Sequence, residues 1–272
     1  MEPRVLIVTP TYNERDNLAE FVAAVRAAAH ITESAKTGSK ASRIASKKTS
    51  KRDSPGKSAG APDDLVELSL RACLIARDAA FNVRDLLTNS SRMAFLAIKD
   101  CEKELDLIER QIDERLPAAI TRVNEARARQ LLASLKCTTN LERIGDLVMS
   151  VALRVQSRNA RMPASDMRQL VEMSAILRDM LDLIHKGFVT LDLECARKVL
   201  QMDKNVDHVC HALFQKHLAE NVPHGDIPGF DILLMAQALE RAGDHTTNLA
   251  EDLYSLIEGR SLRHMPKKRA SQ

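Results

Sequence analysis

The chain has 272 residues, a formal net charge of +3, only 3% aromatic residues and no tryptophan. A core without aromatic side chains must be filled by Leu, Ile, Val, Ala and Met, which suits helices better than sheets. No apolar run approaches the roughly 20 residues needed to span a bilayer, and most of the chain is too near neutral for a nucleic-acid-binding fold. We therefore predict an all-helical cytoplasmic protein that does not bind nucleic acid.

Residues 1–30 differ from the rest of the chain. Residues 4–9 predict a strand, Pro10 begins a turn, and residues 14–29 predict an amphipathic helix. The stretch from Val5 to Leu18 resembles the opening of family 2 glycosyltransferases, where this strand and turn help to form a nucleotide-sugar pocket. The acidic motif of the next strand is missing, and a lone strand and helix cannot build a doubly wound sheet. We interpret this segment as a truncated fragment without transferase activity.

Residues 31–62 read as a linker. Between residues 31 and 60 there are eight Lys or Arg but only two acids, and almost no large apolar side chains. Such a segment cannot bury enough surface to offset the entropy lost on ordering, so it is predicted to be a disordered basic tether. Residues 265–272 form a second, short basic tail.

The body of the chain predicts six helices. Asn89, Asn124 and Asp192 are candidate N-caps, Gly259 is a candidate C-cap, and Pro117 should kink or end the second helix. The predicted spans are 64–88, 90–121, 125–157, 165–189, 193–220 and 230–258.

The body also repeats itself at a spacing of about a hundred residues. The motif Leu-Glu-Arg-Ile-Gly-Asp at 141–146 returns as Leu-Glu-Arg-Ala-Gly-Asp at 239–244, and Asp100-x-x-x-Glu104 returns as Asp203-x-x-x-Asp207. We therefore predict a tandem pair of three-helix bundles at 63–160 and 164–264.

The repeated acids are placed unusually. Acids four residues apart share a helical face, and the flanking residues on these faces are apolar, as in the line Met93, Leu96, Asp100, Glu104 and Leu107. The acid pairs are thus predicted to interrupt core-facing stripes, so that four carboxylates meet in each bundle. Their repulsion requires protonation, basic partners such as Arg143 and Arg241, or a cation. A salt-bridge network and a metal site both remain open.

Oxygen ligands favour Mg²⁺, Ca²⁺, Mn²⁺ or iron over a structural zinc. The Glu-x-x-His spacing of ferritin-like di-iron bundles is absent, since Gly145 and Gly243 follow three residues after Glu142 and Glu240. His245 follows Asp244 directly and is a candidate nitrogen ligand; His208 and His211, beside Asp207, are weaker ones.

The stretch 240–252, followed by 256–260 and His264, resembles the closing helix of the PhoU family of phosphate-uptake regulators, and 141–146 resembles the matching motif of that family's first repeat. The resemblance covers about residues 63–264. It implies a cytoplasmic, usually homodimeric protein without enzymatic activity. Such proteins restrain phosphate-responsive signalling by linking a Pst-type phosphate ABC transporter to a sensor histidine kinase, and they meet the membrane only through these partners.

The E(D)xxxD motifs of this family bind multinuclear metal clusters in some members. The resemblance therefore implies divalent or trivalent metal ions: iron, manganese, magnesium or zinc. The first repeat departs from the pattern, with Leu147, Ser150 and Leu153 where the second has His245, Asn248 and Glu251. Alternatives are a helical di-metal protein and, from residues 1–30 alone, a remnant of a polyprenyl-phosphate glycosyltransferase. The implied ligands are Asp100, Glu104, Glu142 and Asp146 in the first bundle and Asp203, Asp207, Glu240 and Asp244 in the second.

Overall fold

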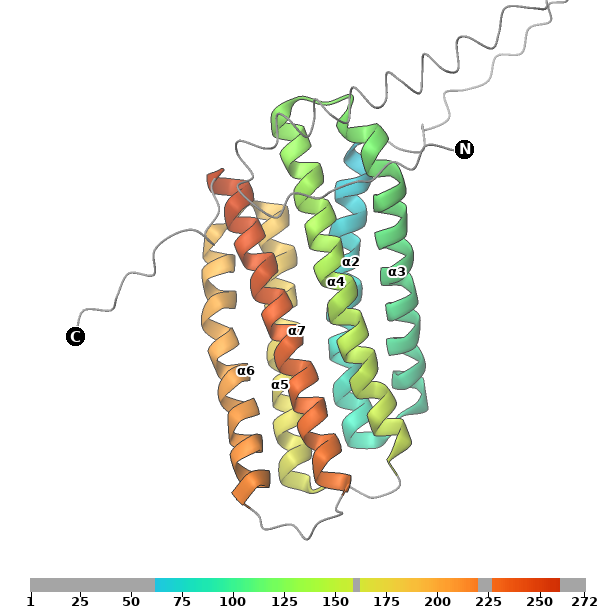
Figure 1. Ribbon diagram of the computed structural model, residues 1–272, viewed down its shortest axis with the longest axis vertical. Coiled ribbons are helices and arrows are strands. Elements are labelled where there is room, and N and C mark those ends of the chain that lie inside the picture. The colour runs from blue at the N-terminus through green and yellow to red at the C-terminus, as the bar shows by residue number, and fades with distance from the viewer. Residues whose placement is uncertain (1–61, 159–161, 220–226, 260–272) are drawn as a thin grey trace, which may run out of the picture.

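The computed structural model describes residues 62–158, 162–219 and 227–259 (Figure 1). Within these ranges the chain is all-helical, as predicted, and the predicted spans agree with the observed bounds to within three residues. The predictions for residues 1–30, for the linker up to residue 61 and for the basic tail lie outside the described residues. The described helices are α2 (Pro62–Asn89), α3 (Arg92–Ile120), α4 (Glu125–Ser157), α5 (Ala164–Thr190), α6 (Leu193–Ala219) and α7 (Ile227–Glu258).

Three predicted helix ends are confirmed. The side chain of Asn124 accepts a hydrogen bond from the backbone N–H of Arg127 at 2.9 Å, which caps the start of α4. The side chain of Asp192 accepts one from the N–H of Glu194 at 2.9 Å and so caps α6. Gly259 follows α7 with a φ of +68°, the left-handed conformation in which glycine carries no steric penalty.

The ends of α3 differ from the prediction. Asn89 is the last residue of α2, and the N-cap of α3 is Ser91, whose hydroxyl accepts from the N–H of Ala94 at 3.2 Å. Both residue types cap helices well, so composition alone did not distinguish them. Pro117 lies inside α3, which continues through Ile120, so the proline does not end the helix.

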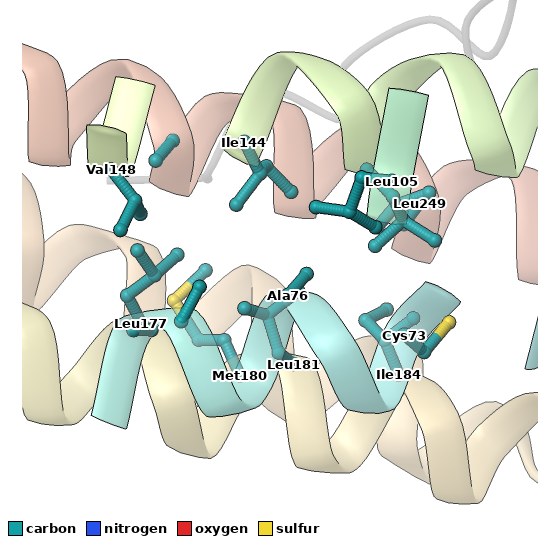
Figure 2. Packing of buried hydrophobic residues seen from close by; sticks show 14 of the residues in the cluster. Cys73, Ala76, Leu105, Ile144, Val148, Leu177, Met180, Leu181, Ile184 and Leu249 are labelled. Carbon is teal, nitrogen blue, oxygen red and sulfur yellow. The ribbon is translucent and has the colours of Figure 1, made fainter. Parts of the chain in front are cut away.

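The six described helices form two three-helix bundles, α2–α4 and α5–α7, joined along their length. Helix α4 packs against α7 and α2 packs against α5, whereas α3 and α6 lie on the outside (Figure 1). Side chains from both bundles meet in one continuous core, as Figure 2 shows for Leu105, Ile144, Leu181 and Leu249. Among the described residues, those fully buried in this core are aliphatic or sulphur-containing and none is aromatic.

None of the described helices contains an apolar stretch long enough to cross a bilayer.

Candidate metal centres

Two equivalent seams bring acidic side chains together, one between α3 and α4 and one between α6 and α7. At each seam, a glycine of the second helix lets the two helices approach each other closely. A Cβ on Gly145 of α4 would lie 2.6 Å from Cδ1 of Leu105 on α3. A Cβ on Gly243 of α7 would lie 3.1 Å from Oδ1 of Asp203 on α6. Each glycine directly precedes an acid of the repeated motif, so the close approach is built into the motif.

The first cluster combines acids of α3 and α4. One carboxylate oxygen from each of Glu102, Asp106 and Asp146 lies within 4.8 Å of the other two. Glu142 stands one turn before Asp146, and its Oε2 is buried and accepts no hydrogen bond. The Nε of the adjacent Arg143 is 3.4 Å from that oxygen, close enough to attract it but not aligned for a hydrogen bond.

Electrostatics at this cluster favour protonated carboxyl groups. Burial, together with the charges of Asp146 and Glu109, raises the pKa of Glu142 to about 7, although Arg143 opposes the rise. The pKa of Glu102 is also raised, first by burial and then by its acidic neighbours. Without a cation, part of this negative charge is therefore neutralised by protons.

The predicted ligands Asp100 and Glu104 do not belong to this cluster. Asp100 is exposed, and Glu104 forms an ion pair with Arg71 of α2. The line of residues that includes them faces solvent, with Met93 75% and Leu107 49% exposed. A step of two residues along a helix rotates the direction of the side chain by about 200°. Glu102 and Asp106 therefore lie on nearly the opposite face of α3 from Asp100 and Glu104. The face of α3 that packs inward is instead marked by Ala94, Ile98, Leu105, Ile108 and Ile112.

The sequence carried a signal for the correct pair. Helix α3 has acids at Asp100, Glu102, Glu104 and Asp106, which form two interleaved pairs, each with the spacing of four residues. The line through Asp100 and Glu104 is apolar at both ends, whereas the line through Glu102 and Asp106 continues with the charged residues Glu109, Arg110 and Asp113, so apolar periodicity favoured the wrong pair. Leu105 is buried against Gly145 of α4, and this contact turns α3 so that Glu102 and Asp106 face the seam.

In the second seam the predicted residues Asp203, Asp207, Glu240 and Asp244 lie near enough to affect one another's charge, but within the described residues only the first seam brings three carboxylate oxygens within 4.8 Å of one another. Oδ1 of Asp203 is buried and has no hydrogen-bond partner. Its pKa is raised to about 6 by burial, then by Asp207, Asp244 and Glu240. Burial and the neighbouring acids also raise the pKa values of Glu240 and Asp244. Asp207 is exposed at the rim.

His245, next to the second cluster, also makes a contact with the first bundle. Its Nδ1 donates a hydrogen bond of 3.0 Å to Oδ1 of Asn140 on α4, so its side chain links the two bundles. His208 and His211 are exposed on α6.

The fold and the seams define a class of protein: tandem three-helix bundles, each with a paired-acid motif on its last helix. A family model described as "PhoU domain" matches residues 70–155 and 170–253, one match in each bundle. The chain belongs to the PhoU family.

Known proteins agree with this assignment. The chain is 30% identical over 189 residues to a phosphate-specific transport system accessory protein PhoU homolog of Rhizobium meliloti, covering 66% of this chain and 78% of the relative. A Burkholderia homolog of the same description is 27% identical over 195 residues, covering 69% and 83%.

Two solved structures share the fold. The crystal structure of PhoU from Pseudomonas aeruginosa matches with a TM-score of 0.65 at 21% identity, covering 73% of this chain and 97% of that one. The phosphate transport system regulatory protein PhoU from Streptococcus pneumoniae matches with a TM-score of 0.67 at 20% identity, covering 74% and 97%.

Proposed function

We propose that this protein is a non-catalytic regulator of phosphate uptake. It acts in the cytoplasm as a homodimer and restrains the phosphate-starvation response by contacting a Pst-type phosphate ABC transporter and a sensor histidine kinase. The observation that carries this proposal is the PhoU-domain match in both bundles, together with relatives described as accessory proteins of phosphate-specific transport. The protein reaches the membrane only through these partners.

We further propose that both acid clusters bind metal ions. Glu142 and Asp203 each hold a buried carboxylate oxygen that accepts no hydrogen bond, an arrangement that is costly unless a cation or a proton compensates. Clustered carboxylates are the ligands that Mg²⁺, Mn²⁺ and iron prefer. The ligands would be Glu102, Asp106, Glu142 and Asp146 in the first cluster and Asp203, Asp207, Glu240 and Asp244 in the second.

The alternative of a pure salt-bridge network is less well supported. In the first cluster Arg143 lies 3.4 Å from Glu142 and 3.5 Å from Asp146, but it is one mostly exposed cation among several acids. Bound cations would supply the missing positive charge and hold α3 to α4 and α6 to α7. The shape of the surface that partners contact would then depend on whether the metal sites are filled.

Deleting the gene tests the regulatory role. We expect a phosphate-starvation reporter to be derepressed in phosphate-replete medium, and the wild-type gene supplied in trans to restore repression. A variant with Glu142→Gln and Asp203→Asn, compared at equal protein abundance, should restore repression poorly. Unchanged reporter expression in the deletion strain would contradict the proposed function.

A further inference from the structure

On the other side of the molecule from the α4–α7 contact, a hollow of about 180 Å³ lies across the seam between α2 and α5. Three arginines line it: Arg84 from α2, and Arg168 and Arg178 from α5. Apolar side chains line it as well, among them Phe81, a residue that is 55% exposed. The hollow thus combines guanidinium groups with an exposed aromatic ring, and both bundles contribute to it.

Part of the positive charge of this hollow is unpaired. Within the described part of the chain, neither Arg84 nor Arg168 forms an ion pair, and both side chains are exposed. Arg178 is paired with the adjacent Asp179, to which it donates from Nε at 2.9 Å and from Nη2 at 2.5 Å, so the unpaired charge is that of Arg84 and Arg168. Glu172 is the one acid among the residues that line the hollow.

The rest of the same seam is built differently. Further along it, Arg77 of α2 pairs with Asp182 of α5 at 3.2 Å, so a cation of one helix meets an anion of the other. At the hollow, by contrast, cations from both helices face the same space. An anion held in the hollow would be attracted by charges from both helices.

We propose that this hollow binds a small phosphorylated compound. Guanidinium groups bind phosphate oxygens through paired, charge-assisted hydrogen bonds, and an exposed aromatic ring packs against an apolar or planar group. The volume of about 180 Å³ is below the usual range of roughly 300–1,000 Å³ for drug-sized ligands, and it suits inorganic phosphate or a compact phosphate ester. Because Arg84 belongs to one bundle and Arg168 to the other, the ligand would bridge the two bundles. This site is separate from the acid clusters and does not depend on the proposed function.

Calorimetric titration of the full chain with inorganic phosphate and with phenyl phosphate tests the proposal at physiological ionic strength. We expect phenyl phosphate to bind, and Arg84→Ala/Arg168→Ala to weaken binding at least about tenfold. A matched control, Arg92→Ala/Arg110→Ala, removes two exposed arginines of α3 with the same charge change and should bind as the wild type does.

Two single variants separate the parts of the site. Phe81→Ala should weaken the binding of phenyl phosphate but leave the binding of inorganic phosphate unchanged. This variant therefore distinguishes a site for a phosphate ester from a site for the free ion. Glu172→Gln removes the one negative charge that lines the hollow and should strengthen the binding of both ligands. A purely structural role for Glu172 would not produce this effect.

Three results would overturn the proposal. The first is no binding of either compound by wild-type protein with a native circular-dichroism spectrum. The second is an equal loss of binding in the α3 control, which would show that only net charge matters. The third is binding of anionic phosphatidylglycerol vesicles through Arg84 and Arg168 with no binding of either small phosphate, which would make this face a lipid-binding surface.

Discussion

At the scale of single residues, the proposed metal binding depends most on Glu142 and Asp203. Each has a buried oxygen without a hydrogen bond, and each has several acidic neighbours. Burial raises the pKa of Glu142 to about 7 and that of Asp203 to about 6, so in the absence of metal both take up protons near neutral pH. A bound cation would displace these protons, so metal binding should strengthen as the pH rises.

This state of Glu142 predicts how stability depends on pH. Its pKa rises from 4.5 in the unfolded chain to about 7 in the fold, so between these values the folded protein holds a proton that the unfolded chain has lost. The free energy of unfolding of the metal-free protein therefore falls as the pH rises through this window. Glu142→Gln should remove part of this fall and give a higher melting temperature than wild type near pH 7.5.

Thermal unfolding in the presence of a chelator, measured at about pH 5 and pH 7.5, checks this expectation. Glu114→Gln is the control, because Glu114 is an exposed acid on α3. A glutamine variant that is less stable than wild type at the higher pH would show that Glu142 contributes as an anion, and the account of burial would be wrong.

At the scale of helices, the sequence predicted where each helix lies in the chain better than it predicted which face of the helix points into the core. The spans followed from apolar periodicity and from caps such as Asn124 and Asp192, which act locally. The inward face of α3 did not follow, because apolar residues lie on both of its faces, and Met93 and Leu107 face solvent while Ile98 and Leu105 are buried. That choice depends on contacts with α4, which a single sequence does not specify.

The corner between α2 and α3 gives a direct test of helix capping. Ser91→Ala should lower the free energy of unfolding by about 1 kcal/mol, because the N–H of Ala94 loses its acceptor. Asn89→Ala should cost only a few tenths of that, since Asn89 donates to the exposed Asp85 and caps nothing. Urea unfolding of both variants measures the difference, and a larger cost for Asn89→Ala would place the cap where the sequence first suggested.

A buried ion cluster joins α5 to α6 and was not anticipated. Asp166 is fully buried in the first turn of α5 and accepts from Nζ of Lys216 at 2.5 Å, with Nε2 of His217 at 3.1 Å. These partners are about fifty residues away, so no local pattern predicts the contact. The position of Asp166 is set by tertiary packing.

Removing this carboxylate should be costly. Asp166→Ala leaves Lys216 without its anion in a partly buried place, and we expect a loss of about 3 kcal/mol in the free energy of unfolding. Asp179→Ala, which removes a half-exposed acid of the same helix, should cost well under 1 kcal/mol. If chemical denaturation finds equal, small losses for the two variants, the cluster contributes no net stability.

At the scale of the whole molecule, the repeat was predictable but the fusion of its two halves was not. The motifs at 141–146 and 239–244 showed that the chain contains two like units. The core, however, is continuous across α4 and α7 and across α2 and α5. Faces that would be surface in a single bundle are therefore interior here.

A shared core predicts cooperative unfolding. Hydrogen exchange followed by mass spectrometry across a urea series should show peptides from α3 and from α6 losing protection at the same midpoint, because neither bundle keeps its core alone. Two well-separated midpoints would mean that the bundles fold independently.

The metal content of purified protein tests the central claim, that acids from equivalent seams of the two bundles hold cations. Elemental analysis should compare wild type with Glu102→Gln/Asp106→Asn and with Asp100→Asn/Glu104→Gln, which removes the same charge from the outer face of α3. We expect the first variant to lose about half of the bound metal and the second to retain it all, since only the first removes ligands of one of two clusters. Equal metal content in all three proteins would contradict the account.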